Sequence, residues 1–134
     1  MTIGTRPVTA TSQIYPVLPA SNLARAEHFY HDMLGMEIEK PSEDHGQFMA
    51  HAGGDSWVLV YKTETPVGGA TAATFMVDDL PAVVSDLRSR GVTFEEYDMP
   101  GLKTVGGIAE MGDERSAWFK DTEGNILAIG EMLH

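Results

Sequence analysis

Residues Trp118–Met132, WFKDTEGNILAIGEM, carry the strongest fold signal in the chain. They begin with the end of an apolar segment, which is typical of a strand. The polar residues 121–125 predict a turn, because Gly124 can adopt a positive φ and Asp121 can hydrogen-bond to its own backbone. Residues 126–130 are apolar and bounded by turn residues, which predicts a buried strand. The stretch is therefore predicted to form a closing hairpin.

The composition is that of an acidic globular protein. The chain has 134 residues, enough for one domain or for two small repeats that share a core. Its net charge of −11 argues against binding to nucleic acid and to anionic membrane surfaces. No apolar run approaches the ~18 residues that a membrane-spanning helix needs. The sequence has no cysteine, which excludes disulfides and thiolate chemistry and is compatible with the cytoplasm.

Apolar periodicity and turn residues divide the chain into two halves. Residues 1–11 are polar, lack a signal-peptide pattern and are expected to be a flexible lead. The first half predicts a strand, a helix and three strands, at 12–19, 23–34, 36–40, 47–52 and 57–62. Residues 63–70 predict a linker. The second half predicts a strand at 71–77, a helix at 80–90, and strands at 92–97, 106–111, 114–120 and 126–130, with a loop at 98–105.

The two halves repeat at an offset of about 57 residues. This offset superposes Asn22, before the first helix, on Asp79, before the second, and brings Gly35 within one residue of Gly91. Each half is a βαβββ unit that leaves one face of its sheet uncovered. We therefore predict an α+β fold, a single domain over 12–134, in which modules 12–62 and 71–132 pair into a concave mixed sheet around a cleft.

Two motifs resemble the vicinal oxygen chelate superfamily, which includes glyoxalase I, extradiol dioxygenases and bleomycin-resistance proteins. The pattern F-x-D-x-x-G-N-I-L at 119–127 resembles its closing hairpin. Residues 16–39, PVLPASNLARAEHFYHDMLGMEIE, resemble its first module, and the PVLPAS opening is nearer to the bleomycin-resistance branch. The resemblance covers about residues 12–132. It implies the paired-module fold, a small-molecule site in the sheet cleft and a homodimer.

The resemblance also implies where a metal ion would bind. In the metalloenzymes of the superfamily, four strands each supply one ligand, and the matching positions here are Tyr15, Val58, Ala72 and Ala128. Alanine and valine have no donor atom, and tyrosine ligates well only as phenolate, with a free pKa of about 10. Neighbouring residues do not supply a ligand set either. We therefore expect no metal and no other cofactor, and no Lewis-acid catalysis by the family's standard route.

Alternation along the strands predicts an apolar cleft with a floor of small residues. Tyr15 and Trp118 would stack on a ligand in it, with the Tyr15 hydroxyl as a polar group. The inward set also includes Val17, Val60 and Ile126. The candidate ligand-binding residues are Tyr15, Val58, Ala72, Thr74, Trp118 and Ala128. Each of them could equally well fill a sandwich interior.

Other polar residues are weaker candidates. His28 and His31 on the first helix, and His45 and His51 around the third strand, have a solvent-exposed alternative. The loop 98–107 is long and glycine-rich and predicts a lid, with Lys103 and Thr104 as its polar groups. Glu131 is expected to point away from the cleft, but it is the carboxylate to test as an acid or base.

The sequence thus predicts a metal-independent small-molecule-binding protein that sequesters an antibiotic or toxic compound. One alternative is a glyoxalase-like, divalent-metal-dependent lyase, isomerase or dioxygenase with relocated ligands from His45, His51, Glu110 or Glu131. Others are a module that binds a protein through its sheet edge, and a metal-free enzyme with Tyr15 as proton donor. No nucleophile elbow or phosphate loop is present.

Overall fold

The computed structural model describes residues 14–40, 46–64 and 68–133. The predicted lead at 1–11 and the candidate His45 lie outside these residues. The described elements are β1 (Val17–Ala20), α1 (Leu23–His28), η2 (Phe29–Met33), β2 (Glu37–Glu39), β3 (Gln47–His51), β4 (Trp57–Lys62), β5 (Thr71–Met76), α2 (Leu80–Ser89), β6 (Asp98–Met99), β7 (Leu102–Lys103), β8 (Ile108–Met111), β9 (Glu114–Lys120) and β10 (Ile126–Met132). Among them no helix is long and apolar enough to cross a membrane.

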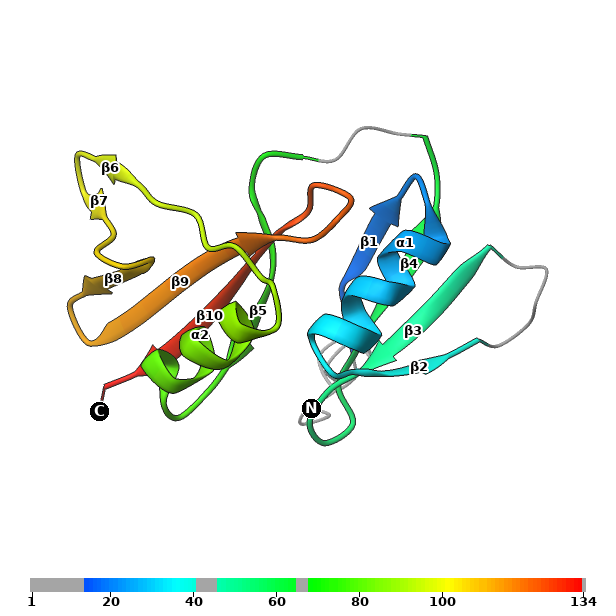
Figure 1. Ribbon diagram of the computed structural model, residues 1–134, viewed down its shortest axis with the longest axis horizontal. Coiled ribbons are helices and arrows are strands. Elements are labelled where there is room, and N and C mark those ends of the chain that lie inside the picture. The colour runs from blue at the N-terminus through cyan, green and yellow to red at the C-terminus, as the bar shows by residue number, and fades with distance from the viewer. Residues whose placement is uncertain (1–13, 41–45, 65–67, 134) are drawn as a thin grey trace, which may run out of the picture.

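The strands form two four-stranded sheets of the same design, side by side in Figure 1. The first sheet has the order β1-β4-β3-β2, and the second has the order β5-β10-β9-β8. In each sheet the strand before the helix pairs in parallel with the last strand, and the remaining pairs are antiparallel. The predicted α+β fold of two βαβββ modules is therefore confirmed.

The helix starts show why the two halves match. Asn22 caps α1 by accepting a hydrogen bond from the Arg25 N–H at 3.0 Å. Asp79 caps α2 in the same way, from the Ala82 N–H at 3.2 Å. In both cases a short polar side chain satisfies a free N–H of the first turn. The equivalence of the two capping residues agrees with the repeat offset that the sequence predicts.

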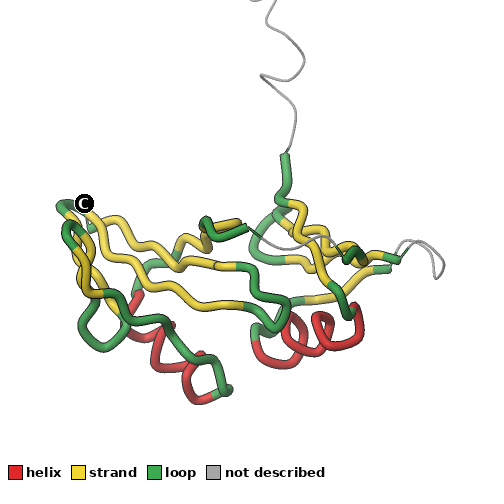
Figure 2. The backbone as a smooth tube through the Cα atoms, turned by 90° about the horizontal axis from the view of Figure 1, so that it is seen from above, coloured by secondary structure: helices red, strands yellow, loops and turns green. Residues whose placement is uncertain are grey.

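Both helices lie on the same side of the strands (Figure 2). In the first sheet, Leu18, Val60 and Phe48 are in register on neighbouring strands and at most 2% exposed. Tyr30 is fully buried in the same core. The second sheet contributes residues such as Phe119 to that core. We call the opposite side of both sheets, away from the helices, the open face.

Two predictions between α2 and β8 need correction. Residues 92–97 do not form a strand: Phe94 makes a single bridge to Phe119, and the Glu95 N–H donates to the Trp118 carbonyl. The reason is that β8 already pairs with β9 over 114–117, which leaves little of that edge free. The predicted loop at 98–105 contains the short β6–β7 hairpin.

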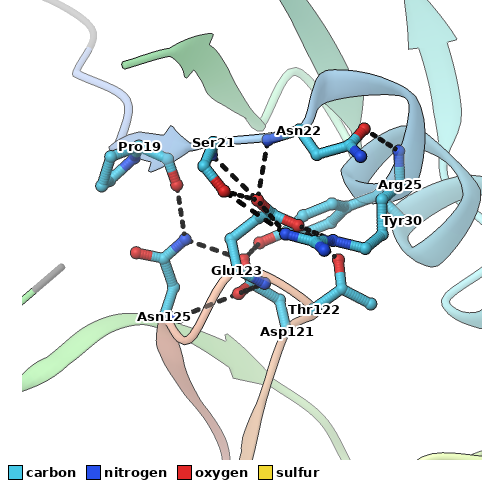
Figure 3. A network of polar contacts seen from close by, with 9 residues as sticks. All are labelled: Pro19, Ser21, Asn22, Arg25, Tyr30, Asp121, Thr122, Glu123 and Asn125. Atoms are coloured by element: carbon cyan, nitrogen blue, oxygen red, sulfur yellow. Dashed lines mark hydrogen bonds and ion pairs between the residues drawn. The ribbon is translucent and has the colours of Figure 1, made fainter. Parts of the chain in front are cut away.

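The closing hairpin joins the two modules (Figure 3). Its turn reaches from the second sheet to the start of α1, where a Glu123 oxygen accepts the N–H groups of Ser21 at 2.9 Å and Asn22 at 3.0 Å. The other oxygen accepts the Arg25 Nε–H at 2.7 Å. The Glu123 side chain is 1% exposed. This one carboxylate therefore binds both backbone and charge of the other module.

Asp121 forms the second half of this junction. One of its oxygens accepts the buried Tyr30 hydroxyl at 2.7 Å. The other accepts the N–H groups of Glu123 and Asn125, which shapes the turn. Asn125 in turn donates from its side-chain amide to the Pro19 carbonyl, at 2.9 Å. The residues that make the predicted turn thus also bind β1 and the helix of the first module.

Candidate functional site

A row of aligned side chains crosses the open face of the second sheet. Ala128 on β10 lies opposite Thr74 on β5 and opposite Trp118 on β9, so three predicted site residues are cross-strand neighbours. Ala72 and Thr74 are exposed on β5, whereas Ala128 is 5% exposed between its larger neighbours. The next position on β10 is Gly130 in the same alternation, where an added Cβ would lie 3.3 Å from the Met76 sulfur. The row therefore places the small Ala128 side chain between the Trp118 ring and the Thr74 hydroxyl.

The first sheet carries an aromatic cluster on its open face. Tyr15 precedes β1, is 45% exposed, and packs its ring against Trp57 with 5.1 Å between centroids. The His51 ring lies 6.1 Å from the same indole. Aromatic faces held in this way present a flat apolar surface with polar edges, which suits a planar ligand. Tyr15, a predicted site residue, is thus brought to Trp57 and lies on a different sheet from the row at Ala128.

Val58 was assigned to the cleft, and this assignment is wrong. Val58 is 6% exposed and belongs to the hydrophobic core, as does Val60. Trp57 and Leu59 alternate with them and are less buried, so they occupy the open face instead. The error is a shift of one residue in β4, which moves every side chain of a strand to the other face.

Trp57 and Tyr97 are aromatic residues of the open face that the sequence prediction missed. Trp118 packs nearly perpendicular to Tyr97, with 5.5 Å between the ring centroids, so part of its indole is covered by another ring. Trp57 was detectable, because it begins the strongly β-prone segment WVLVYK and needed only the correct alternation. Tyr97 was not detectable, since its contact depends on the path of a loop.

Three histidines of the described residues, His28, His31 and His51, are paired with nearby carboxylates. Asp32 accepts from the Nδ1 atoms of both His28 and His31, at 2.5 and 2.6 Å, and the hydrogen bond to His31 is the largest of the influences that lower the pKa of Asp32. His51 Nε2 lies 2.8 Å from a Glu39 oxygen across two paired strands. Within residues 14–40, 46–64 and 68–133, no group of three His, Asp or Glu side chains is arranged to hold one metal ion.

Glu131 points away from the open face, as predicted. It accepts the Leu80 N–H at the start of α2 at 2.8 Å, and Arg115 donates to its second oxygen at 3.1 Å. The hydrogen bond from Leu80 is the main cause that lowers the pKa of Glu131, although burial opposes it. A carboxylate held in this way anchors a helix, and its geometry does not place it against a ligand on the open face. Glu110, by contrast, is exposed on β8.

The loop predicted as a lid is anchored at both ends. Thr104 is 8% exposed, and its hydroxyl accepts the Tyr97 N–H and donates to Glu96. Glu96 also accepts the Gly107 N–H, at 3.1 Å. Of the two polar candidates, Thr104 therefore holds the loop together, and Lys103 is exposed. Figure 1 places the β6–β7 hairpin at the end of the molecule far from the first sheet.

These features define a class: paired βαβββ modules with helices on one side and an open sheet face on the other. The chain belongs to the Glyoxalase/Bleomycin resistance protein/Dioxygenase superfamily, whose sequence profile matches residues 12–129.

Solved structures of the same fold come from proteins with different activities. TnmS3, an antibiotic binding protein from Streptomyces sp. CB03234, is 20% identical over 90% of this chain and 97% of its own, with a TM-score of 0.63. Lactoylglutathione lyase from Agrobacterium tumefaciens is 21% identical over 90% and 93%, with a TM-score of 0.60. The fosfomycin resistance protein FosX from Listeria monocytogenes is 12% identical over 89% of both chains, with a TM-score of 0.66. At these identities the likeness establishes the fold.

Proposed function

We propose that this protein binds a small molecule on its open face without a metal ion, and so sequesters an antibiotic or another toxic compound. The observation that carries the proposal is the row Thr74–Ala128–Trp118, where a small residue lies between an aromatic ring and a hydroxyl. Of the four positions that supply metal ligands in related enzymes, only Tyr15 has an oxygen atom in its side chain. A flat ligand with polar substituents fits this chemistry. TnmS3 and FosX lend support, since an antibiotic-binding and an antibiotic-resistance protein have this fold.

The proposal includes a homodimer in the cytoplasm. Large apolar side chains remain exposed: Val17 is 50%, Met76 62% and Met132 55% exposed. A second copy that covered part of this surface would remove them from water and would deepen the site. The cysteine-free sequence is compatible with a reducing compartment.

Ligand-induced stabilisation tests the binding proposal. We would follow thermal unfolding of chelator-treated protein by circular dichroism against tetracycline, doxorubicin and bleomycin as planar or aromatic probes. A ligand at a hundred times its Kd adds about 2.7 kcal/mol to stability, which raises the Tm by several degrees. We expect Ala128→Phe, which fills the row, to abolish the shift, and Ala24→Phe, on the exposed side of α1, to retain it.

Thermal unfolding of the chelator-treated protein also tests the metalloenzyme alternative. Chelator-treated protein would be melted with Mn²⁺, Fe²⁺, Co²⁺, Ni²⁺ and Zn²⁺ beside elemental analysis of the untreated sample. We expect none of these ions to raise the Tm. A near-stoichiometric metal with a matching Tm shift would overturn metal independence and favour a lyase, isomerase or dioxygenase.

A further inference from the structure

A pocket on the helix side of the second sheet lies at the edge formed by β7, β8 and β9. It has a volume of about 450 Å³, which is within the range of small-molecule sites. Five residues line it: Lys103, Val105, Ile108, Glu110 and Arg115. We call it the edge pocket. Its lining combines two cations, one carboxylate and two aliphatic side chains, so it offers contacts to a ligand that is both charged and apolar.

The edge pocket and the open face are on opposite sides of the sheet. Ile108 lies directly opposite Ala117, which belongs to the hydrophobic core. Side chains two residues apart on a strand share a face, so Glu110 and Arg115, which are also directly opposite each other, lie on the helix side. The row at Ala128 uses the other side. The edge pocket is therefore a separate site, and the residues that line it take no part in the proposed binding site.

Lys103 and Arg115 bring positive charge to the pocket. Among the lysines and arginines of residues 14–40, 46–64 and 68–133, the Lys103 side chain alone forms no ion pair, hydrogen bond or ring contact. One guanidinium nitrogen of Arg115 donates to Glu131 at 3.1 Å, and the Arg115 side chain is still 28% exposed. The chain as a whole carries −11, so two cations beside one pocket favour a ligand with an anionic group there.

Glu110 makes the pocket unsuitable for a simple anion. It lies directly opposite Arg115, and Cβ atoms of such partners are about 5 Å apart. Arg115 nevertheless pairs with Glu131, and within the described residues Glu110 has no ion pair of its own. Glu110 would repel an anion, and the two cations would repel a cation. A ligand that carries both charges close together avoids both repulsions.

Val105 and Ile108 supply an apolar surface beside these charges. Val105 is 75% exposed, and Ile108 is half-buried. The two residues form an antiparallel bridge, so their side chains lie next to each other on one face. Exposed charged contacts are weak by themselves, because water screens them. A ligand that also covers these two side chains gains hydrophobic free energy that a purely charged ligand does not.

We propose that the edge pocket binds a free α-amino acid with an apolar side chain. Its carboxylate lies between Lys103 and Arg115, its ammonium group donates to Glu110, and its side chain covers Val105 and Ile108. One carbon atom separates the two charged groups of such a molecule, which matches the placement of Glu110 and Arg115 on adjacent strands. The inference does not rest on the proposed function, since the two sites share no residue.

Four probes separate the three kinds of contact. Leucine carries both charges and an aliphatic side chain. Isocaproate lacks the ammonium group, isoamylamine lacks the carboxylate, and glycine lacks the side chain. Each is titrated into ¹⁵N-labelled protein, and binding is followed on the backbone amides of residues 103–110. We expect saturable shifts with leucine, and binding at least about fivefold weaker with each of the other probes.

Substitutions that remove one charge locate the contacts. Lys103→Gln should weaken leucine binding about fivefold, and its control, Lys120→Gln, removes another exposed lysine and should leave leucine binding unchanged. Glu110→Gln should bring leucine and isocaproate to equal affinity, whereas Glu114→Gln should keep the preference for leucine. All four side chains are exposed, so the variants should fold as the unchanged protein does.

Three results would overturn the proposal. One is a titration with leucine that produces no saturable shift at residues 103–110. Another is equal affinity of leucine and isocaproate for the unchanged protein, which would mean that Glu110 takes no part. The third is a loss of leucine binding in Lys120→Gln as large as the loss in Lys103→Gln, which would mean that net charge and not the pocket attracts the ligand.

Discussion

Glu123 shows how much one side chain contributes at the junction of the modules. Burial by itself raises the pKa of its carboxyl, but hydrogen bonds from Arg25, the Asn22 N–H and Thr122, with the Arg25 charge, outweigh burial and lower the pKa from 4.5 to about 2. The carboxylate is thus ionised whenever the protein is folded near neutral pH. Arg25 is about half exposed, so the screened ion pair contributes less than the buried backbone contacts.

We expect Glu123→Gln to weaken the fold in a pH-dependent way. Because the folded-state pKa is lower than the unfolded value, the ionised group stabilises the fold above pH 4.5, and this stability is lost as the pH falls toward 2. The lower pKa of Glu123 in the folded state corresponds to on the order of 3 kcal/mol of stability at pH 7. In urea denaturation at pH 7, the free energy of unfolding of the variant should lie well below that of the unchanged protein. At pH 3 this difference should be less than half as large.

The control for this prediction is Glu114→Gln. Glu114 is an exposed carboxylate at the start of β9, and its replacement should change the free energy of unfolding by less than about 0.5 kcal/mol at both pH values. A gap between Glu123→Gln and the unchanged protein that stayed constant from pH 7 to pH 3 would contradict the ionised role of Glu123.

The segment between α2 and β8 is held in place by close packing around Gly107. Gly107 has a φ of +83°, and a Cβ at this position would lie 2.9 Å from an Arg88 nitrogen and 3.1 Å from the Phe94 Cβ. Arg88 in turn donates to the Gly106 carbonyl at 2.8 Å and lies over the Phe94 ring. An added side chain at Gly107, at the end of the loop that contains β6 and β7, would therefore have to displace Arg88 or Phe94.

We expect Gly107→Ala to be more destabilising than Gly106→Ala. Both residues have positive φ, so alanine carries a backbone strain of roughly 1–2 kcal/mol at either position. Only Gly107 has a close neighbour, since nothing lies within 4 Å of a Cβ at Gly106. Overpacking at Gly107 should add about 1–3 kcal/mol in chemical denaturation. Equal losses for the two variants would show that Arg88 and Phe94 move aside freely.

At the scale of the whole molecule, the two four-stranded sheets are joined by the junction around Asp121 and Glu123. Each sheet contains one of the two tryptophans, Trp57 in β4 and Trp118 in β9. Side chains from both modules share one hydrophobic core. The two sheets should therefore unfold together and not one after the other.

Single-tryptophan variants test this cooperativity. Trp118→Phe leaves a reporter in the first sheet, and Trp57→Phe leaves one in the second. We expect the fluorescence midpoint of each variant in urea to coincide with the midpoint of the same variant by circular dichroism. A fluorescence transition that preceded the circular-dichroism transition in either variant would mean that one sheet melts alone.

Local patterns in the sequence were sufficient to predict the elements and their repetition. Helix caps, glycine stops and β-prone runs act within a few residues, so α2, β4 and β9 are predicted close to their observed bounds. The helix predicted over residues 23–34 is divided into α1 and η2. The capping pair Asn22 and Asp79 follows from spacing alone. The same holds for the turn at Asp121, where side chain and backbone are neighbours in the chain.

Only the tertiary structure decided which side chains share a site. Val58 and Trp57 differ by one residue, and only the pairing of β4 with its neighbours assigns one to the core and the other to the open face. The Tyr15–Trp57 contact and the Glu123–Arg25 pair join residues far apart in the chain. Their geometry depends on how two modules pack, and that packing balances many weak contacts that no local pattern records.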